Sequence, residues 1–274
     1  MSISQEEAWL LKEKYGGEKT ALVFKESLDE IKNKYSWGED FFTDLERLKA
    51  GEPLAYIIGH TPFLNCQINL NSHPLIPRVE TEYWVEKAIE SIRRENISNV
   101  RVLDLCAGSG CVGVAVAKAV RDARVTFAEI DSAHLPTIKQ NLAHNLPDYS
   151  NRIEYLQVTL SNLFDNVSGT FDFILTNPPY IDPALDRTES SVKSHEPHLA
   201  LFGGQNGLAI INNIVTQAPQ YLRDGGQLWI EHEPEQVEAI HLLAAHNGFS
   251  VVTNKDQYDV ERFSILLLQN QAVK

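Results

Sequence analysis

Before residue 52, apolar positions recur every three to four residues among lysines and glutamates. This spacing puts the apolar side chains on one face of a helix. Breaks in the pattern near Gly16 and Ser36 divide it into about three short helices. We therefore expect an N-terminal helical domain over residues 1–52. Its apolar positions are Ala8, Leu10, Leu11, Leu22, Val23, Leu28, Ile31, Phe41, Phe42, Leu45 and Leu48.

The next segment, residues 53–78, places proline, glycine and asparagine around two short β-like runs at 55–58 and 66–70. Short apolar runs bounded by turn-forming residues predict a hairpin. We expect this segment to be a hairpin linker between two domains. A helix over residues 80–94 is predicted to follow it.

Beyond residue 100 the pattern alternates between short apolar strands and amphipathic helices. Such alternation is typical of a doubly wound, mostly parallel sheet, and continuous apolar runs indicate a sheet buried on both faces. The short link between the last two strands predicts an antiparallel hairpin at one edge. Residues 79–274 are thus predicted to form an α/β domain with a seven-stranded, Rossmann-like sheet of the class I methyltransferase type, although a fold alone does not give a function. The predicted strands are 100–105, 125–130, 153–158, 171–176, 227–231, 250–253 and 263–268, and the predicted helices are 111–120, 133–145, 208–222 and 234–246.

Prolines and tryptophans add detail to these elements. Pro219 lies inside the predicted helix 208–222 and should kink it or end it early. Pro136 falls in the first part of its helix, where a missing N–H costs little. The four tryptophans lie on apolar patterns and are expected in the core; they are Trp9, Trp37, Trp84 and Trp229.

The 274 residues carry a formal net charge of −13, and 43% of them are hydrophobic. The hydrophobic share fits a folded protein, and the acidic balance argues against broad binding to a nucleic-acid backbone. Three cysteines without a CxxC pair fit a reduced, cytoplasmic protein. We expect neither a signal sequence nor a membrane span, because no suitable apolar run occurs. The histidines show no ligand spacing, so no metal site is expected, and residues 231–233 (Glu-His-Glu) are interpreted as a polar cluster at a strand end.

A glycine-rich turn follows the first predicted strand, in the sequence Asp-Leu-Cys-Ala-Gly-Ser-Gly at residues 104–110. Gly108 and Gly110 have no Cβ, so the backbone can come close to a ligand there. Glu129 ends the second strand, where a carboxylate can accept hydrogen bonds from ribose hydroxyls; Asp131 is the alternative. The turn lacks the third glycine of a dinucleotide fingerprint and has no basic residue near it for a pyrophosphate. S-adenosylmethionine therefore suits it better than NAD, while the glycines alone could also mark only a tight turn.

The fourth predicted strand runs into Asn177, Pro178, Pro179 and Tyr180. Two prolines end a strand, so the segment could be only a terminator. An asparagine before them and an aromatic after them, at the edge where ligands bind, favour chemistry. A planar NH2 nitrogen is a poor nucleophile, because its lone pair is delocalised. Asn177 Oδ1 and the Pro178 carbonyl can accept its two hydrogens, the rigid prolines fix that carbonyl, and Tyr180 can pack on the flat group.

We therefore predict methyl transfer to a planar NH2 nitrogen. Asn177, Pro178 and Tyr180 are the candidate catalytic residues. Together with Pro179 they are the candidate substrate-binding residues.

Several stretches keep the order and spacing of a known enzyme family: residues 51–59, 75–82, 104–110, 177–182 and 196–197. From about residue 51 onwards the chain resembles the protein-(glutamine-N5) methyltransferases that act on peptide chain release factors, the HemK-like enzymes. The resemblance implies a helical domain that docks the release factor, a β-hairpin linker and a domain that binds S-adenosylmethionine. The implied substrate is the glutamine of a Gly-Gly-Gln tripeptide. The implied cofactor contacts are Cys106, Ala107, Gly108, Ser109, Gly110, Glu129, Asn162, Leu163 and Asn177.

The chain departs from the family pattern in four places. The region before Gly51 is shorter than usual, which bears on partner docking. Val79 replaces a proline, Cys106 replaces a glycine, and Asn162 replaces an aspartate. Without a charge at residue 162 we expect weaker cofactor binding.

Other functions share parts of this pattern. N6-adenine and N4-cytosine nucleic-acid methyltransferases use a similar Asn/Asp-Pro-Pro-aromatic segment, but they must extrude a base and hold its backbone, which an acidic chain suits poorly. Glutamine methylation of a ribosomal protein is closer in chemistry. The residues Glu80, Thr81 and Glu82 favour the release-factor branch. A protein that binds the cofactor without catalysis is the non-enzymatic alternative.

Overall fold

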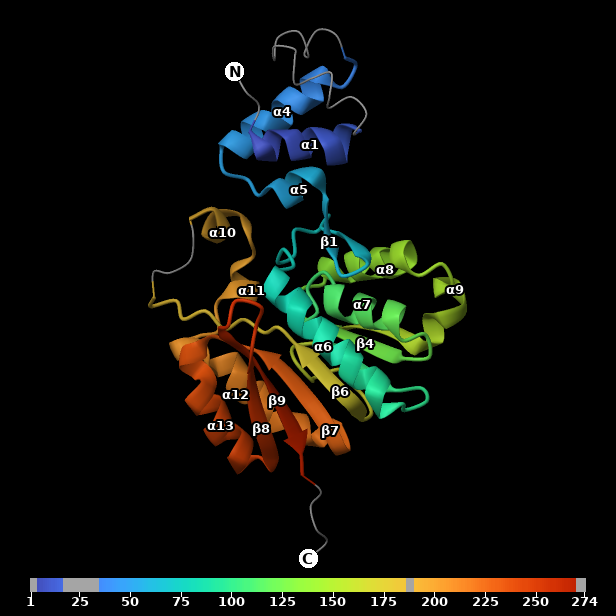
Figure 1. Cartoon of the computed structure of the whole chain (residues 1–274), viewed down its shortest axis with the longest axis vertical. Coiled ribbons are helices and arrows are strands. Elements are labelled where there is room, and N and C mark those ends of the chain that lie inside the picture. Colours follow the sequence, from blue (N-terminus) through green and yellow to red (C-terminus); the bar gives the residue numbers. More distant parts are fainter. Residues whose placement is uncertain (1–3, 17–34, 186–189, 270–274) are drawn as a thin grey trace, which may run out of the picture.

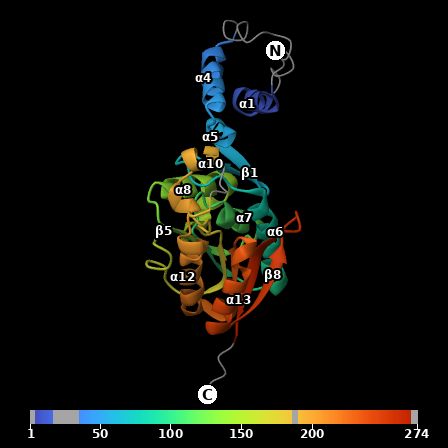
Figure 2. The ribbon, with the colours of Figure 1, turned by 90° about the vertical axis from the view of Figure 1, so that its left-hand side faces the viewer.

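The computed structural model describes residues 4–16, 35–185 and 190–269. A small group of helices at the N-terminal end lies above a larger α/β body, and the C-terminal end lies on the opposite side of that body (Figures 1 and 2). The expected apolar positions Leu22, Val23, Leu28 and Ile31 fall outside the described residues. No helix in the described ranges is long and apolar enough to cross a membrane.

The N-terminal group consists of α1 (Gln5–Tyr15), α4 (Gly38–Lys49) and α5 (Leu54–Ile58). The Ser4 hydroxyl accepts from the Glu7 N–H at 3.2 Å and the Glu7 carboxylate accepts from the Ser4 N–H at 2.7 Å, which begins α1 with a capping box. The three helices share a small core of Leu10, Leu11, Phe41, Leu45 and Ile57.

The predicted strand at 55–58 is wrong, because this run forms α5. A short apolar run does not by itself distinguish a strand from a helix. Pro53 precedes the first helical residue, and Gly59 ends the helix in the left-handed conformation with φ 91°. The hairpin lies just beyond, in β1 (His60–Phe63) and β2 (Cys66–Asn69).

The hairpin is fixed to the large body by asparagines of α8 (His134–Asn145). The Asn145 Oδ1 accepts from the Gln67 N–H at 3.0 Å, and the Asn141 Oδ1 accepts from the Asn69 N–H at 2.7 Å. These bonds satisfy donors on the outer edge of β2. The hairpin therefore connects the N-terminal helices to the large α/β body as a docked element.

The large sheet has the predicted architecture, with seven strands in the order β5-β4-β3-β6-β7-β9-β8. Neighbouring strands are parallel except at β9, which is antiparallel to both of its neighbours. The expected antiparallel hairpin at one edge is confirmed, with β9 inserted between β7 and β8. The bounds are β3 (Arg101–Leu105), β4 (Arg124–Glu129), β5 (Leu156–Leu160), β6 (Phe171–Thr176), β7 (Leu222–Glu231), β8 (Phe249–Lys255) and β9 (Glu261–Leu268).

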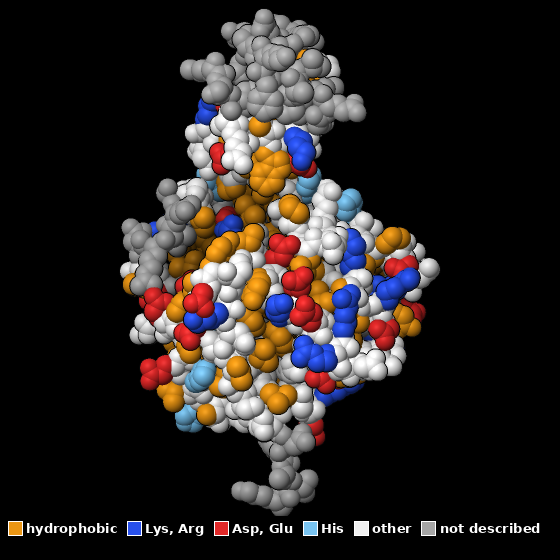
Figure 3. Space-filling view, viewed as in Figure 1, with side chains coloured by type: hydrophobic (Ala, Val, Ile, Leu, Met, Phe, Trp, Pro, Cys, Tyr) orange, Lys and Arg blue, Asp and Glu red, His pale blue; other side chains and the backbone are white. Residues whose placement is uncertain are grey.

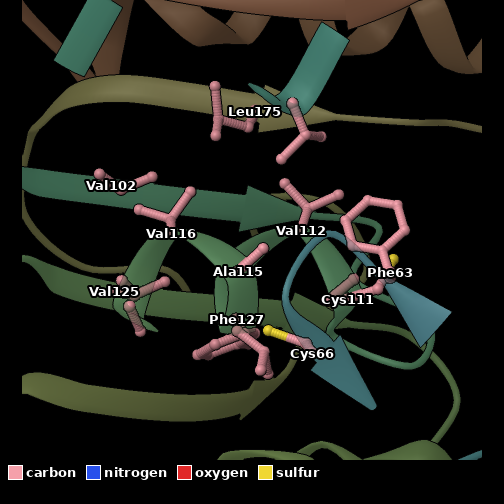
Figure 4. Packing of buried hydrophobic residues seen from close by; sticks show 14 of the residues in the cluster. Phe63, Cys66, Val102, Cys111, Val112, Ala115, Val116, Val125, Phe127 and Leu175 are labelled. Atoms are coloured by element: carbon pink, nitrogen blue, oxygen red, sulfur yellow. The ribbon is translucent and has the colours of Figure 1, made fainter. Parts of the chain in front are cut away.

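Both faces of the sheet are covered, as the apolar runs predicted. Alternate strand residues point to opposite faces, so Val102 packs in one core cluster and Leu103 in the other. Figure 4 shows the first cluster, where Phe63 of the hairpin lies beside Val112 of α7 and Cys66 lies beside Phe127 of β4. The helices on this face are α6 (Val79–Glu95), α7 (Cys111–Ala119) and α8, and those on the other face are α12 (Ala209–Gln217) and α13 (Val237–His246).

Two element boundaries differ from the prediction. Helix α12 ends at Gln217 and a 3-10 turn containing Pro219 follows, so the proline ends the helix early as expected. Strand β7 begins at Leu222, not at residue 227, because it continues through an irregularity in its pairing with β6 at Gly225 and Gly226. Arg223, Asp224 and the two glycines show no apolar strand pattern, so the sequence did not predict this part of β7.

The beginning of β5 and one tryptophan also correct the expectations. Residues Ile153–Tyr155 form a 3-10 turn and the strand begins at Leu156. Trp84 and Trp229 are buried, Trp37 is half-buried, and the side chain of Trp9 is 49% exposed on α1. Trp9 is therefore a surface residue of the N-terminal helices and not a core residue.

Acid is expected to destabilise the protein through His232, which is fully buried at the end of β7. Its Nδ1 lies 3.0 Å from the Glu233 carbonyl and its Nε2 lies 2.8 Å from the Ser264 hydroxyl, a pattern that fits the neutral ring. Burial lowers the pKa of His232 from 6.5 to about 4. The unfolded chain therefore binds a proton that the folded chain does not, and stability falls as the pH drops from 6.5 towards 4.

Denaturant unfolding at several pH values measures this loss, which amounts to at most about 3 kcal/mol. The variant His232→Gln should show a flatter dependence across that window than the parent. His246→Gln, at an exposed position, serves as the control. Equal slopes for parent and His232→Gln would contradict the assignment.

Candidate active site

The carboxyl ends of two adjacent parallel strands bring the glycine turn next to the Asn-Pro-Pro-Tyr segment. Leu105 of β3 pairs with Thr176 of β6, and the Thr176 hydroxyl donates to the Leu105 carbonyl at 2.8 Å. The glycine turn continues from Leu105, and Asn177 continues from Thr176. Ligands of such sheets bind outside this edge. One cavity is in fact lined by both Gly108 and Asn177.

The glycine turn adopts a left-handed backbone at three positions. The φ angles are 60° at Cys106, 53° at Gly108 and 76° at Gly110. A Cβ at Gly108 would meet open space, whereas a Cβ at Gly110 would lie 3.0 Å from Ile138. Cys106 therefore adopts a conformation that favours glycine. This explains in physical terms why cysteine at this position was noted as a departure in the sequence.

Glu129 points its carboxylate at this turn. It accepts from the Gly108 N–H at 2.6 Å and from the Asp131 N–H at 2.8 Å. The Asp131 carboxylate accepts instead from the Ala133 N–H at 2.8 Å, in the turn that leads to α8. Of the two acids considered from the sequence, Glu129 is thus the one held against the glycine turn.

The cavity at this turn contains most of the predicted cofactor residues. Ala107 and Ser109 are buried and face the protein: the Ala107 N–H donates to the Ala128 carbonyl and the Ser109 carbonyl accepts from Asn141 of α8. No lysine or arginine is among the described residues of the lining, which disfavours a cofactor with a pyrophosphate. The predicted residues that line it are Cys106, Gly108, Glu129, Asn162, Leu163 and Asn177.

A second cavity, of about 640 Å³, lies on the other side of Asn177. Leu75, Asn177 and Ala200 line both cavities, so the two spaces adjoin at Asn177. Figure 3 shows hydrophobic side chains gathered in a hollow below the N-terminal helices, beside the α10 segment (Ser190–His195). The second cavity also contains Arg78, Pro178, Tyr180, Ile181, Asp182, Leu185, Val192, Leu201, Asn206, Leu208, Glu233, Glu235 and Gln236.

The segment after Pro179 is fixed by the surrounding loops. The Tyr180 carbonyl accepts from the Gln236 side-chain amide at 2.8 Å, and the Ile181 N–H donates to the Leu201 carbonyl at 2.9 Å. A Cβ at Gly207 would lie 1.8 Å from the Tyr180 oxygen, and Gly207 has φ 68°, so only glycine fits this close approach. These contacts therefore fix the backbone at Tyr180 and Ile181, where the Asn-Pro-Pro-Tyr segment ends.

A carboxylate tethers the linker to the loop above the second cavity. Glu196 is buried, and its oxygens accept from the Ile76 N–H and from the Arg78 guanidinium. Arg78 also lines the second cavity. The family-like stretches at 75–82 and 196–197 thus contact each other and form one side of the hollow.

Several residues of the site were missed by sequence reasoning or given another role. Glu231 was interpreted only as part of a strand-end cluster and Trp84 only as core, yet both lie behind Asn177, with Thr81 between Glu231 and Asn177. Gln236 was not singled out. Because Glu231 ends a parallel strand at the ligand-binding edge, its position carried a signal that could have identified it. Among the described residues no group of three or more His, Cys, Asp and Glu side chains is placed to hold a metal ion.

An aspartate in place of Asn162 is expected to strengthen binding of the cofactor predicted from the sequence. Asn162 lines the cofactor cavity, and a carboxylate there would accept a hydrogen bond from an adenine amino group with the help of its charge. We expect the dissociation constant of S-adenosylhomocysteine to fall by about threefold to tenfold in Asn162→Asp, measured by calorimetry. Asn151→Asp, an exposed change of the same charge away from the cavity, is the control. Micromolar or tighter binding by the parent that Asn162→Asp leaves unchanged would contradict this prediction.

Comparison with known proteins places this architecture in one family. The family model described as Methyltransferase small domain matches residues 89–193. The chain is 32% identical to the release factor glutamine methyltransferase of Borreliella burgdorferi, over 84% of this chain and 77% of that protein. It is 37% identical to the protein of the same name from Leptospira interrogans, over 81% and 77% of the two chains. The catalytic domain of hMettl16, solved with a MAT2A 3'UTR hairpin, shares the fold alone, with a TM-score of 0.57, 16% identity and coverage of 76% of this chain and 77% of that one. The chain belongs to the release factor glutamine methyltransferase family.

Proposed function

We propose that this protein transfers a methyl group from S-adenosylmethionine to the side-chain amide nitrogen of the glutamine in the Gly-Gly-Gln tripeptide of a peptide chain release factor. The observation that carries the proposal is the position of Asn177, which lines both the cavity at the glycine turn and the larger cavity beside it. A group that must contact both a methyl donor and an acceptor belongs at such a boundary. The similarity to proteins named release factor glutamine methyltransferase supports the choice of acceptor.

The cavity at the glycine turn fits S-adenosylmethionine. Glu129 offers carboxylate oxygens to ribose hydroxyls, and Gly108 lets the backbone come close. Asn162 and Leu163 also line this cavity, and we propose that they contact the adenine. When bound there, the cofactor supplies an electrophilic methyl group on a sulfonium. The acidic and apolar lining agrees with a cationic group that carries no phosphate.

The acceptor residues provide orientation and charge stabilisation. Asn177 Oδ1 and the Pro178 carbonyl accept the two hydrogens of the glutamine amide, which turns the face of the nitrogen towards the cofactor cavity. As the nitrogen forms its new bond it gains positive character, so both hydrogen bonds become stronger in the transition state. Tyr180 packs against the planar amide. The fixed backbone of residues 177–181 means that little reorganisation accompanies the reaction.

The N-terminal helices are proposed to dock the release factor. A groove of about 460 Å³ lies between α1 and the hairpin and is lined by Trp9, Leu54, Ile58, Pro62 and their neighbours. The exposed Trp9 offers a large apolar surface of the kind enriched at interfaces. We therefore assign residues 1–52 to docking, residues 53–78 to the linker and residues 79–274 to catalysis.

Transfer of labelled methyl groups tests the proposed function. The protein is incubated with labelled S-adenosylmethionine and, separately, with a release factor, its Gln→Ala variant in the tripeptide, ribosomal proteins and DNA. We expect label on the release factor alone. Label on the Gln→Ala variant to the same extent as on the parent factor would disprove the proposed acceptor, and preferential labelling of DNA or a ribosomal protein would assign the site to that substrate.

A further inference from the structure

A buried chain of hydrogen bonds lies behind Asn177. The Asn177 side-chain amide donates to the Thr81 hydroxyl at 3.0 Å, and the Thr81 hydroxyl donates to Glu231 Oε2 at 2.7 Å. The same oxygen accepts from the Trp84 indole N–H at 2.6 Å, and Glu231 Oε1 accepts from the Tyr180 hydroxyl at 2.9 Å. Glu231 is 1% exposed and Thr81 is 2% exposed, so water does not replace these bonds.

The donor and acceptor capacities of these groups determine which way the Asn177 amide faces. An indole N–H can only donate, so Glu231 Oε2 is an acceptor at that position. The Thr81 hydroxyl has one hydrogen, which it donates in its hydrogen bond to Glu231 Oε2. Thr81 therefore has only lone pairs left for Asn177, and Asn177 must turn its NH2 group towards Thr81. Its Oδ1 then faces away from Thr81.

We propose that Thr81 and Glu231 are positioning residues, which fix the orientation of the Asn177 amide so that its oxygen, and not its NH2 group, meets the substrate amide. This inference rests on the proposed methylation of a glutamine amide and deepens it. In the opposite orientation an NH2 group would face another NH2 group, and neither could accept a hydrogen. The same carboxylate also fixes Tyr180, so one buried group orients both side chains of the acceptor site.

The orientation is the same when Glu231 is ionised and when it carries a proton on Oε1. Burial raises the pKa of Glu231, and the hydrogen bonds from Trp84, Thr81 and Tyr180 oppose that effect. If the carboxyl takes up a proton on Oε1, the bond with Tyr180 reverses, but Oε2 still accepts from Trp84 and Thr81. In both forms the relay requires only that Oε2 accepts hydrogen bonds from Trp84 and Thr81.

Removal and restoration of the Thr81 hydroxyl tests the proposal. Thr81→Val keeps the shape and Thr81→Ala reduces it, and both leave the Asn177 NH2 group without its acceptor; Thr81→Ser restores a hydroxyl. With release factor as substrate we expect kcat to fall by about 30- to 100-fold in the first two variants and by less than about threefold in Thr81→Ser. Affinity for S-adenosylhomocysteine, measured by calorimetry, should stay within about threefold of the parent in all three.

Two further variants separate positioning from packing. Thr137→Val removes another buried threonine hydroxyl, which donates to Ser72 away from the acceptor segment, and it should leave kcat unchanged. Glu231→Gln can direct its oxygen at Thr81 and Trp84 and its NH2 group at Tyr180, so we expect kcat within about fivefold of the parent.

Each possible result bears either on the positioning role or on the proposed function. Full turnover in Thr81→Val, a loss in Thr81→Ser equal to that in Thr81→Val, or a parallel loss of cofactor affinity and turnover would each overturn the positioning role. A collapse of kcat in Glu231→Gln would show that the charge is needed and would also overturn it. If the parent itself fails to methylate the release factor, the proposed function fails, and that result is read from the parent alone.

Discussion

Replacement of Asn177 with alanine is expected to lower kcat by about 100- to 1,000-fold, because it removes one of the two acceptors that hold the glutamine amide. The effect should appear in kcat, since the lost hydrogen bond is strongest in the transition state. Affinity for the cofactor should fall only modestly, because Asn177 is one of many residues that line the cofactor cavity. Steady-state turnover with release factor, together with calorimetry of S-adenosylhomocysteine, separates the two effects.

A nearby asparagine gives the matched control for this change. Asn206 lines the same acceptor cavity but lies outside the Asn-Pro-Pro-Tyr segment. Its backbone carbonyl, and not its side chain, accepts the hydrogen bond from Gln236. Because its φ of 54° favours asparagine or glycine, Asn206→Gly is the appropriate replacement. It should change kcat far less than Asn177→Ala does. Unchanged turnover in Asn177→Ala would remove Asn177 from the reaction.

Replacement of Glu129 with alanine is expected to weaken cofactor binding by about 30- to 100-fold, which corresponds to about 2–3 kcal/mol. The change removes the carboxylate proposed to hold the ribose and also the acceptor of the Gly108 N–H. At saturating cofactor kcat should recover, because contacts to the ribose are equally strong before and during methyl transfer. Calorimetry and the cofactor dependence of turnover provide the measurements.

Asp131→Ala is the comparison that decides between the two acids. Asp131 also lines the cavity, but its carboxylate is used to cap the turn before α8. We expect a smaller loss of affinity in Asp131→Ala than in Glu129→Ala. A larger loss in Asp131→Ala would assign the ribose to Asp131.

Much of the fold could be predicted from the periodicity of apolar residues. Several strands of the sheet are nearly continuous apolar runs, and β6 is buried along its whole length, so their positions stood out in the sequence. The errors lie where local pattern is ambiguous. The run at 55–58 is too short to distinguish helix from strand, and the polar and glycine residues 223–226 do not resemble a strand although β7 begins at Leu222.

The candidate site could also be predicted only in part. Asn177, Gly108 and Glu129 could be singled out because each follows a strand at the same edge of the sheet, so their proximity follows from topology. The relay through Thr81 and Trp84 could not, because these residues lie on α6, and only the packing of that helix against β7 brings them to Glu231. A helix that covers a sheet has a rotation and a register that apolar spacing alone does not specify.

The exposed Trp9 illustrates a third limit. An apolar residue in a helical pattern is predicted to be buried, and the pattern does not show which face has a partner within the same chain. The neighbouring Leu10 and Leu11 are buried against α4 and α5, while Trp9 lies at the groove between α1 and the hairpin. The surface position that we propose for docking thus resembles a core position in the sequence.

The most direct measurement is the site of methylation on a release factor. After incubation with the protein and S-adenosylmethionine, the factor is digested and its peptides are sequenced by tandem mass spectrometry. The account predicts a single added methyl group on the side-chain nitrogen of the glutamine in the Gly-Gly-Gln tripeptide, formed about 100- to 1,000-fold more slowly when Asn177 is alanine. A methyl group on any other residue, or on that glutamine at the same rate with the Asn177→Ala variant, would contradict it.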